Sequence, residues 1–237
     1  MLRRIETDGV SILSFTSIDM RFLILGATGP AGILLVRKTL EVYPQSTVVV
    51  YARSPQKLPE DITNHASVTV IQGQLDDSDT FSTALQGVDV VLSALGPGYP
   101  HPANTPIANG YKALVKLMRE QGIKRLIALG TPSIPDPNDK STLTFRLMVK
   151  TVKTLAPTAY ADIVAVGEVI RGEGADLEWT LARVPLLTNG DSEEVSVGYL
   201  GEPQVYARLA RKGFAAFVVK EVEERKWVRA SPALSTP

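Results

Sequence analysis

The sequence contains no cysteine among its 237 residues, which excludes disulfide bonds, thiolate catalysis and cysteine-based metal sites. It has only two histidines, His65 and His101, and they stand in unrelated segments. A zinc site would have to be built mostly from carboxylates, so we expect no metal centre. Neither charge sign is in excess, because 25 basic residues face 25 acidic ones. We therefore expect neither nucleic acid nor an anionic membrane as a partner.

Long hydrophobic runs are also missing, and no stretch approaches the length of a membrane span. The first residues, MLRRIETDGVSILSF, include basic side chains, but Glu6 and Asp8 interrupt them and the apolar part is short for a secretory signal. We therefore expect a cytoplasmic protein. Met20 stands directly before the first expected strand, so residues 1–19 are predicted to be an N-terminal extension, either disordered or an extra strand. Residues 20–237 are predicted to form one domain.

What the sequence does contain, from Met20 onward, is an alternation of short apolar runs and longer amphipathic segments. The runs VVVY, VDVVLS and RLIAL are nearly continuous, which is typical of strands covered on both faces in a parallel sheet. Strands are expected at 22–25, 47–51, 68–72, 88–93, 125–129, 179–183 and 195–199. Helices are expected at 31–43, 79–85, 107–121, 143–155, 160–171 and 208–223. The alternation predicts an α/β fold with a doubly wound parallel sheet.

A glycine triplet, Gly26, Gly29 and Gly32, stands between the first expected strand and helix in FLILGATGPAGILLV. The first glycine allows a tight turn, the second lets backbone approach a pyrophosphate, and the third permits close helix–strand packing. The helix then offers free N–H groups to phosphate, and Pro30 suits its first turn. A tight turn without a ligand is the alternative, but the order strand, triplet, helix, strand favours a nucleotide site. The loop residues expected to contact the nucleotide are Gly26, Thr28, Gly29, Pro30, Ala31 and Gly32.

The end of the second expected strand, VVVYARSPQKL, indicates which nucleotide is bound. A site that prefers NAD usually places Asp or Glu there, about 20 residues after the last glycine. This chain has Arg53 instead, and a guanidinium pairs with the 2′-phosphate that distinguishes NADP. A solvated surface arginine is the alternative interpretation. We expect NADP(H) as the cofactor.

Five motifs, GATGPAG, YARSPQKL, VIQGQLDD, VVLSALG and WTLARVP, together resemble the atypical short-chain dehydrogenase/reductase group. That group includes NmrA-like NADP-binding proteins and the flavin reductase/biliverdin reductase type. The likeness runs from about Arg21 to the end of the chain. It implies a Rossmann domain with NADP lying across the strand ends.

The resemblance also implies positions for individual residues along the cofactor. Gln74 and Leu75 would flank the adenine, although the family more often has Asp at the Gln74 position. Thr131 would lie at the nicotinamide end. Residues 183–186, which include Arg183 and Pro185, would border the carboxamide. The residues implied beneath the middle of the cofactor are Ser93, Ala94, Leu95 and Gly96.

The usual catalytic centre of short-chain dehydrogenases is incomplete in this sequence. It consists of Tyr-x-x-x-Lys plus a Ser, and the lysine activates the tyrosine. Tyr160 is the obvious tyrosine, but Val164 takes the place of the lysine, and Gly130 and Thr131 replace the serine. A phenol without a neighbouring cation can donate a proton but is a poor base, so any chemistry is predicted to be reduction. A packing role for Tyr160 at the start of a helix is the alternative.

Other titratable residues near this region carry weaker signals. Lys150 and Lys153 could supply the missing charge from the preceding helix, although solvated lysines are the simpler interpretation. Asp162 and Glu168 are expected on different helix faces and make no acid–base pair. His101 follows the fourth strand in a proline-rich loop and could reach a substrate, although a lone loop histidine is more often exposed.

Three functions remain open at this point. We predict an NADPH-dependent reductase of a small conjugated acceptor (a carbonyl compound, quinone or flavin), with Thr131 and Tyr160 as catalytic candidates. A non-catalytic NADP(H)-binding sensor that acts on a protein partner is the alternative, which the missing lysine and serine favour. Two proline-rich loops at strand ends favour a substrate pocket instead. A biosynthetic isomerase or cyclase on the same fold is the third.

Overall fold

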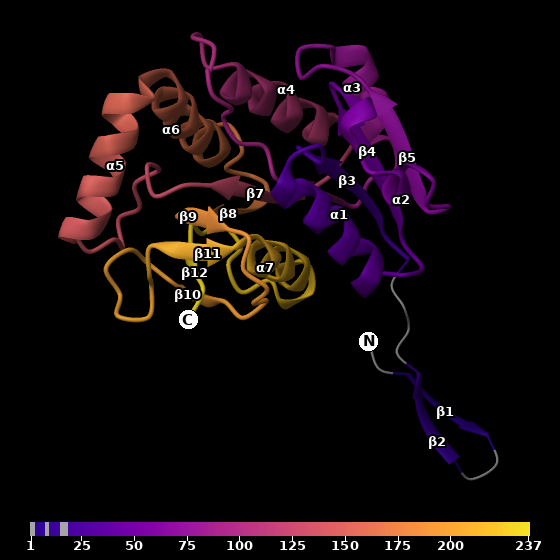
Figure 1. The fold of residues 1–237 in the computed structure, drawn as a ribbon. Helices are drawn as coiled ribbons and strands as arrows, with labels where there is room; N and C mark the ends of the chain where they lie inside the picture. Colours follow the sequence, from indigo (N-terminus) through magenta and orange to yellow (C-terminus); the bar gives the residue numbers. More distant parts are fainter. Residues whose placement is uncertain (1–2, 8–9, 15–18) are drawn as a thin grey trace.

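The central feature of the computed structural model, which describes residues 3–7, 10–14 and 19–237, is an eight-stranded sheet (Figure 1). Its strand order is β10-β12-β8-β7-β6-β3-β4-β5. The parallel strands are β3 (Arg21–Leu25), β4 (Thr47–Ala52), β5 (Val68–Gln72), β6 (Val90–Ser93), β7 (Arg125–Gly130) and β8 (Glu178–Arg183). The chain winds outward from β3 through β4 to β5, and then from β6 through β7 to β8. The predicted doubly wound α/β sheet is therefore confirmed, and its switch point lies between β3 and β6.

The continuous apolar runs have a direct explanation in the sheet. Successive side chains of β3 point to opposite faces, and both faces are covered. Leu23 and Leu25 belong to the core on one face, whereas Phe22 and Ile24 belong to the core on the other. A strand buried on both sides cannot alternate apolar with polar residues, so it appears in the sequence as an unbroken apolar run.

The helices form two layers, one on each face of the sheet (Figure 1). Helices α1 and α7 pack together against the face that holds Ile24, and α3, α4 and α6 cover the face that holds Leu23. Helix α5 lies outside this arrangement and packs on α6. The helix bounds are α1 (Pro30–Val42), α2 (Glu60–Thr63), α3 (Ser78–Leu85), α4 (Pro106–Glu120), α5 (Leu143–Leu155), α6 (Pro157–Gly172) and α7 (Arg211–Glu224).

The C-terminal part of the chain differs from the sequence prediction in two places. The helix expected at 208–223 begins only at Arg211, because Arg208–Ala210 forms a strand, β11, that pairs in parallel with β9 (Leu186–Thr188). The strand expected at 195–199 is β10 (Ser196–Gly198), and it runs antiparallel to β12 (Ala233–Ser235). That final strand was not predicted.

Strands β1 (Arg3–Thr7) and β2 (Val10–Ser14) pair antiparallel in a sheet of their own. The separation of residues 1–19 from the domain remains a prediction. A short 3-10 helix, η1 (Pro55–Lys57), follows β4. Within the described ranges, no helix is both long and apolar enough to cross a membrane.

Candidate functional site

The candidate site lies at the edge of the sheet where the parallel strands end. The register pairs Leu25 with both Tyr51 and Ser93, and Ser93 with Ala128. These strands therefore finish side by side, and the segments that follow them share one edge. Ligands of open α/β sheets bind at this edge, at the switch point.

Two glycines of the triplet are required by the protein itself. Gly26 has φ +74°, and a Cβ there would lie 2.7 Å from the backbone of Ala94 and Leu95. A side chain at Gly32 would overlap the carbonyl oxygen of Gly26. The first glycine thus lets the turn pass close to the segment after β6, and the third lets α1 pack against the turn.

The middle glycine is not required by the protein in this way. Gly29 has φ −86° and ψ 159°, which any residue adopts, and a Cβ there would meet nothing nearer than 3.6 Å. It is the N-cap of α1, no side chain caps the helix, and Pro30 has no N–H to offer. The N–H groups of Ala31 and Gly32, next in the first turn, have no partner within a helix. A space left open before free N–H groups fits a phosphate.

Arg53 is the first residue after β4, and its side chain is exposed. It forms no ion pair with any carboxylate in the part of the chain that the structure describes. Lys57, at the end of η1, is also exposed and adds a second positive charge to the segment. A free guanidinium at this strand end can receive a phosphate without first losing a carboxylate partner.

The turn after β5 is held by Tyr51, whose hydroxyl donates a hydrogen bond of 2.7 Å to the carbonyl oxygen of Gln74. Burial, followed by the charges of Asp77 and Asp76, raises the pKa of Tyr51 to about 12, so the phenol keeps its proton and remains a donor. The side chain of Gln74 is exposed, whereas Leu75 packs against the core. This turn can therefore present both residues at the edge of the sheet.

Ser93 has a role inside the protein. It is fully buried, and its hydroxyl accepts hydrogen bonds from the Tyr111 hydroxyl at 2.6 Å and the Leu95 N–H at 3.3 Å. Burial raises the pKa of Tyr111, which keeps that phenol protonated. The serine thus fixes the turn after β6, while Ala94 and Leu95 are half-buried and Gly96 is exposed.

The side chain of Arg183 also makes its hydrogen bonds inside the protein. Its side chain is fully buried, and its guanidinium donates to both carboxylate oxygens of Asp139, at 2.6 and 2.8 Å. It also donates to the carbonyl oxygens of Ser231 and Ile134. The contact with the carboxamide that the resemblance implies would therefore be made by the backbone of Arg183 and by the half-buried Pro185.

The two hydroxyl groups expected at the nicotinamide end lie on different elements. Thr131 follows β7, and its hydroxyl accepts a hydrogen bond from the Ser133 N–H at 3.2 Å, so its own proton is free to be donated. Tyr160 stands near the start of α6 and is half-buried. The Nζ atom of Lys153, from α5, lies 5.4 Å from the centre of the Tyr160 ring. A cation is thus present over the ring face, although Val164 leaves none on α6 one helical turn beyond Tyr160.

The expectation that His101 is an exposed loop histidine is wrong. Its side chain is only 6% exposed, and its Nε2 lies 2.7 Å from the carboxylate of Asp162 on α6. Sequence reasoning missed this pair because 61 positions separate its members. A local signal existed, since Asp162 follows Ala159 and precedes Val166 on the buried face of α6. Within the described ranges, no group of three or more His, Asp or Glu side chains could hold a metal ion.

Comparisons with known proteins identify a family of dinucleotide-binding proteins. A family model described as NAD(P)H-binding matches residues 26–225. The chain is 29% identical over 167 residues to an oxidoreductase, aflX, of Aspergillus parasiticus, covering 65% of this chain and 60% of that protein. The chain thus spans less than two thirds of that relative.

Solved structures show the same fold. A short-chain dehydrogenase/reductase of Veillonella parvula in complex with NADP has a TM-score of 0.75 and 19% identity, over 93% of this chain and 96% of that one. ChuY, an anaerobillin reductase of Escherichia coli, has a TM-score of 0.71 and 17% identity, over 92% and 97% of the two chains. At these identities the likeness shows a shared architecture.

Proposed function

This chain belongs to the NAD(P)H-binding family, and on that premise we propose that it is an NADPH-dependent oxidoreductase that reduces a small conjugated acceptor. The acceptor class is a carbonyl compound, a quinone or a flavin. The observation on which the proposal chiefly rests is the open space at Gly29, before the free N–H groups of Ala31 and Gly32, in a loop whose other glycines the protein needs for itself.

The residues present fit a dinucleotide phosphate. The first turn of α1 would hold the pyrophosphate through the N–H groups of Ala31 and Gly32, with the positive end of the helix dipole behind them. Arg53 would hold the 2′-phosphate, because its guanidinium is exposed and without a carboxylate partner among the described residues. We therefore propose that NADPH is preferred over NADH.

The chain's own contribution to reduction would be orientation and proton supply. When bound, the reduced dinucleotide supplies the hydride. Thr131 and Tyr160 are proposed as donors of hydrogen bonds to the acceptor oxygen, since the Thr131 hydroxyl keeps a free proton and Tyr160 stands near the start of α6. Lys153 would favour negative charge on the bound acceptor or on the phenol. The names of two similar proteins, an oxidoreductase and an anaerobillin reductase, support reduction as the reaction class.

The test is consumption of NADPH, followed by its near-ultraviolet absorbance, with a panel of para-nitrobenzaldehyde, menadione and riboflavin. Turnover of any of these acceptors with NADPH, and slower turnover with NADH, supports the proposal. A Gly29→Asp variant, which blocks the phosphate space, is the control that assigns the turnover to this site. Activity that survives in that variant would overturn the assignment.

One observation favours a second candidate, a redox sensor that binds NADP(H) without turnover. Val164 stands where the activating lysine of the family is usual, so the phenol of Tyr160 has no cation one helical turn along α6. Tight binding of NADPH, together with no consumption across the acceptor panel, would favour the sensor over the reductase.

A further inference from the structure

The pair formed by His101 and Asp162 joins the segment after β6 to α6. The two side chains are 6% and 0% exposed, and Nε2 of the imidazole lies 2.7 Å from Oδ2 of the carboxylate. A second contact ties the same segments, because the Thr158 hydroxyl donates to the backbone carbonyl oxygen of His101 at 2.9 Å. His101 is thus held through both its backbone carbonyl group and its side chain.

The carboxylate of Asp162 also accepts hydrogen bonds from two backbone N–H groups. Its Oδ2 accepts the N–H of Ile107 at 2.9 Å, and its Oδ1 accepts the N–H of Ala108 at 2.8 Å. Both belong to the first turn of α4, where the helix dipole favours a negative charge. A carboxylate held in this way is an acceptor with a fixed position.

This arrangement decides how the imidazole of His101 can work. Because the Asp162 carboxylate accepts, Nε2 must carry a proton and donate it. The other ring nitrogen, Nδ1, has no hydrogen-bond partner among the residues that the structure describes. Nδ1 is also absent from the fully buried nitrogen atoms left without a partner in the described part, so it keeps some solvent-accessible surface. Nδ1 is therefore the ring atom left to bond a ligand or water while Nε2 holds the ring in place.

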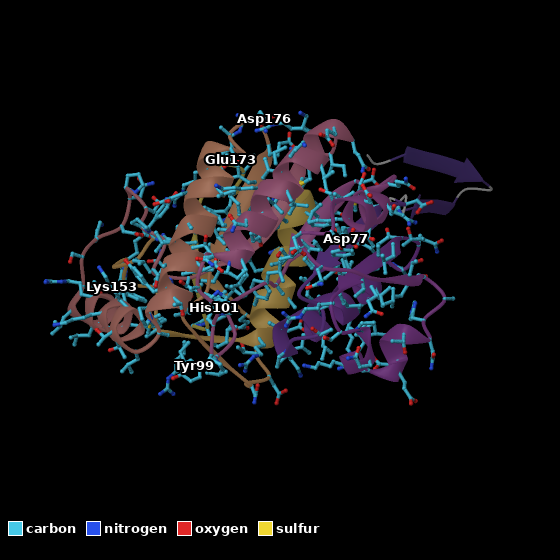
Figure 2. The ribbon with its side chains drawn as sticks, turned by 90° about the horizontal axis from the view of Figure 1, so that it is seen from above. Asp77, Tyr99, His101, Lys153, Glu173 and Asp176 are labelled. Atoms are coloured by element: carbon cyan, nitrogen blue, oxygen red, sulfur yellow. The ribbon has the colours of Figure 1, made fainter. Side chains whose placement is uncertain are left out.

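The pair lies at the ligand-binding edge. In Figure 2, Tyr99 lies at the side of the molecule opposite Asp176, which follows the end of α6, and His101 lies between Tyr99 and Glu173. His101 belongs to the segment that begins at Ala94, directly after β6, and its partner lies two residues beyond Tyr160 on α6. Both candidate donors for the acceptor and the histidine thus come from elements that meet at one edge.

We propose that His101, oriented by Asp162, donates the proton that completes reduction of a carbonyl acceptor; this rests on the proposed reductase function. Reduction adds a hydride from the reduced nicotinamide to the carbonyl carbon, and the C=O electron pair moves to oxygen. That oxygen takes the proton from Nδ1 of the imidazolium. The ring is left neutral with Nε2–H still donated to Asp162, and water returns the proton to Nδ1. Thr131 and Tyr160 hold the oxygen, and His101 supplies its proton.

The test compares His101→Gln with His65→Gln, which removes the other histidine. The glutamine amide can still donate to Asp162 but has no group that takes the place of Nδ1. We expect kcat for para-nitrobenzaldehyde to fall about 10²–10⁴-fold in His101→Gln, the range of general acid catalysis. The kcat for menadione should fall less, because water can protonate a reduced quinone. His65→Gln should match the parent protein with both acceptors.

A measurement on the parent protein reports the ring directly. The sequence has two histidines, so the His65→Gln variant assigns the imidazole ¹⁵N signals of His101 in a long-range ¹H–¹⁵N spectrum. The neutral ring should carry its proton on Nε2. The Nδ1 signal should shift when para-nitrobenzaldehyde is added to the complex with oxidised NADP, which cannot turn over. A ring protonated on Nδ1 alone would overturn the proposal, even if His101→Gln failed to fold.

The kinetic outcomes distinguish a failure of the proton-donor role from a failure of the proposed reductase function. If the parent protein reduces para-nitrobenzaldehyde and His101→Gln is equally fast, the proton-donor role is wrong and the reductase function stands. If kcat falls equally with both acceptors in His101→Gln, and the NADPH affinity and melting temperature fall as well, the pair only stabilises the structure and the proton-donor role is wrong. If the parent protein consumes NADPH with none of the acceptors in the panel, the proposed function is wrong, and the proton-donor role is wrong with it.

Discussion

Replacing Gly29 by aspartate should make the protein more stable and its dinucleotide site useless. Gly29 is the N-cap of α1, its backbone is already extended, and a Cβ there meets nothing closer than 3.6 Å. An aspartate at this position can accept the N–H of Ala31 or Gly32, as N-cap carboxylates do. The N-cap bond, the favourable helix dipole and the stiffer unfolded chain together stabilise by about 1 kcal/mol.

The same carboxylate competes with the cofactor in two ways. It takes the N–H groups that would hold the pyrophosphate, and it places a negative charge beside the phosphate. Two unit charges about 4 Å apart repel by about 4 kcal/mol at an effective dielectric constant of about 20. We therefore expect the affinity for NADPH to fall about 10³-fold. Gly29→Asn, which has nearly the same size without the charge, should keep the part of the stability gain that does not depend on charge and lose less affinity.

The assays are thermal melting without ligand and titration of NADPH by its fluorescence. In a chain of this size, about 1 kcal/mol raises the melting temperature by about 2–4 °C. A higher melting temperature together with a lower affinity for NADPH would show that glycine is needed at this position for ligand binding and not for folding. A folded Gly29→Asp protein that binds NADPH like the parent would refute the phosphate site. A lower melting temperature would refute the conformational argument.

Three further substitutions test other parts of the site and its support. Arg53→Asp should remove a preference for NADPH over NADH of about 10–100-fold, because one charge-assisted pair contributes about 1.5–3 kcal/mol; equal affinities in the parent protein would contradict it. Tyr160→Phe should lower carbonyl reduction by at most about 10²-fold in a steady-state assay, and complete loss would assign the proton to the phenol. Asp139→Asn should destabilise by about 3–5 kcal/mol in urea unfolding, because it leaves the buried Arg183 guanidinium without its carboxylate; an unchanged midpoint would contradict it.

The fold and the glycine-rich turn before α1 could be predicted from the sequence because most of their causes are local. The run at β3 is continuous because Phe22 and Leu23 face two different cores. The glycine triplet is visible within one short segment, where Gly32 avoids the carbonyl oxygen of Gly26, although Gly26 itself avoids the distant backbone of Ala94 and Leu95. The start of α6 was placed too late, at Tyr160, although Pro157 offers the fixed φ of a first helical turn.

The parts that could not be predicted depend on contacts between distant segments. The motif WTLARVP resembles a cofactor-binding strand end, yet its arginine, Arg183, is bound to Asp139 from the loop after β7. A charge in a sequence does not reveal whether its partner is water, a ligand or a buried carboxylate. His101 was missed for the same reason, because the side chain that orients it is on another helix.

Strand β12 has a consequence for how the chain acquires its fold. It lies after α7 in the sequence, yet it lies beside β8, where Ala233 pairs with Arg183. A nascent chain therefore presents β8 as an open edge until α7 and β12 have been synthesised, and open edges invite pairing between chains. Contacts this distant in sequence also form slowly. A chain cut after Arg229 should consequently aggregate during refolding, even though every residue of the glycine-rich turn before α1 would be present.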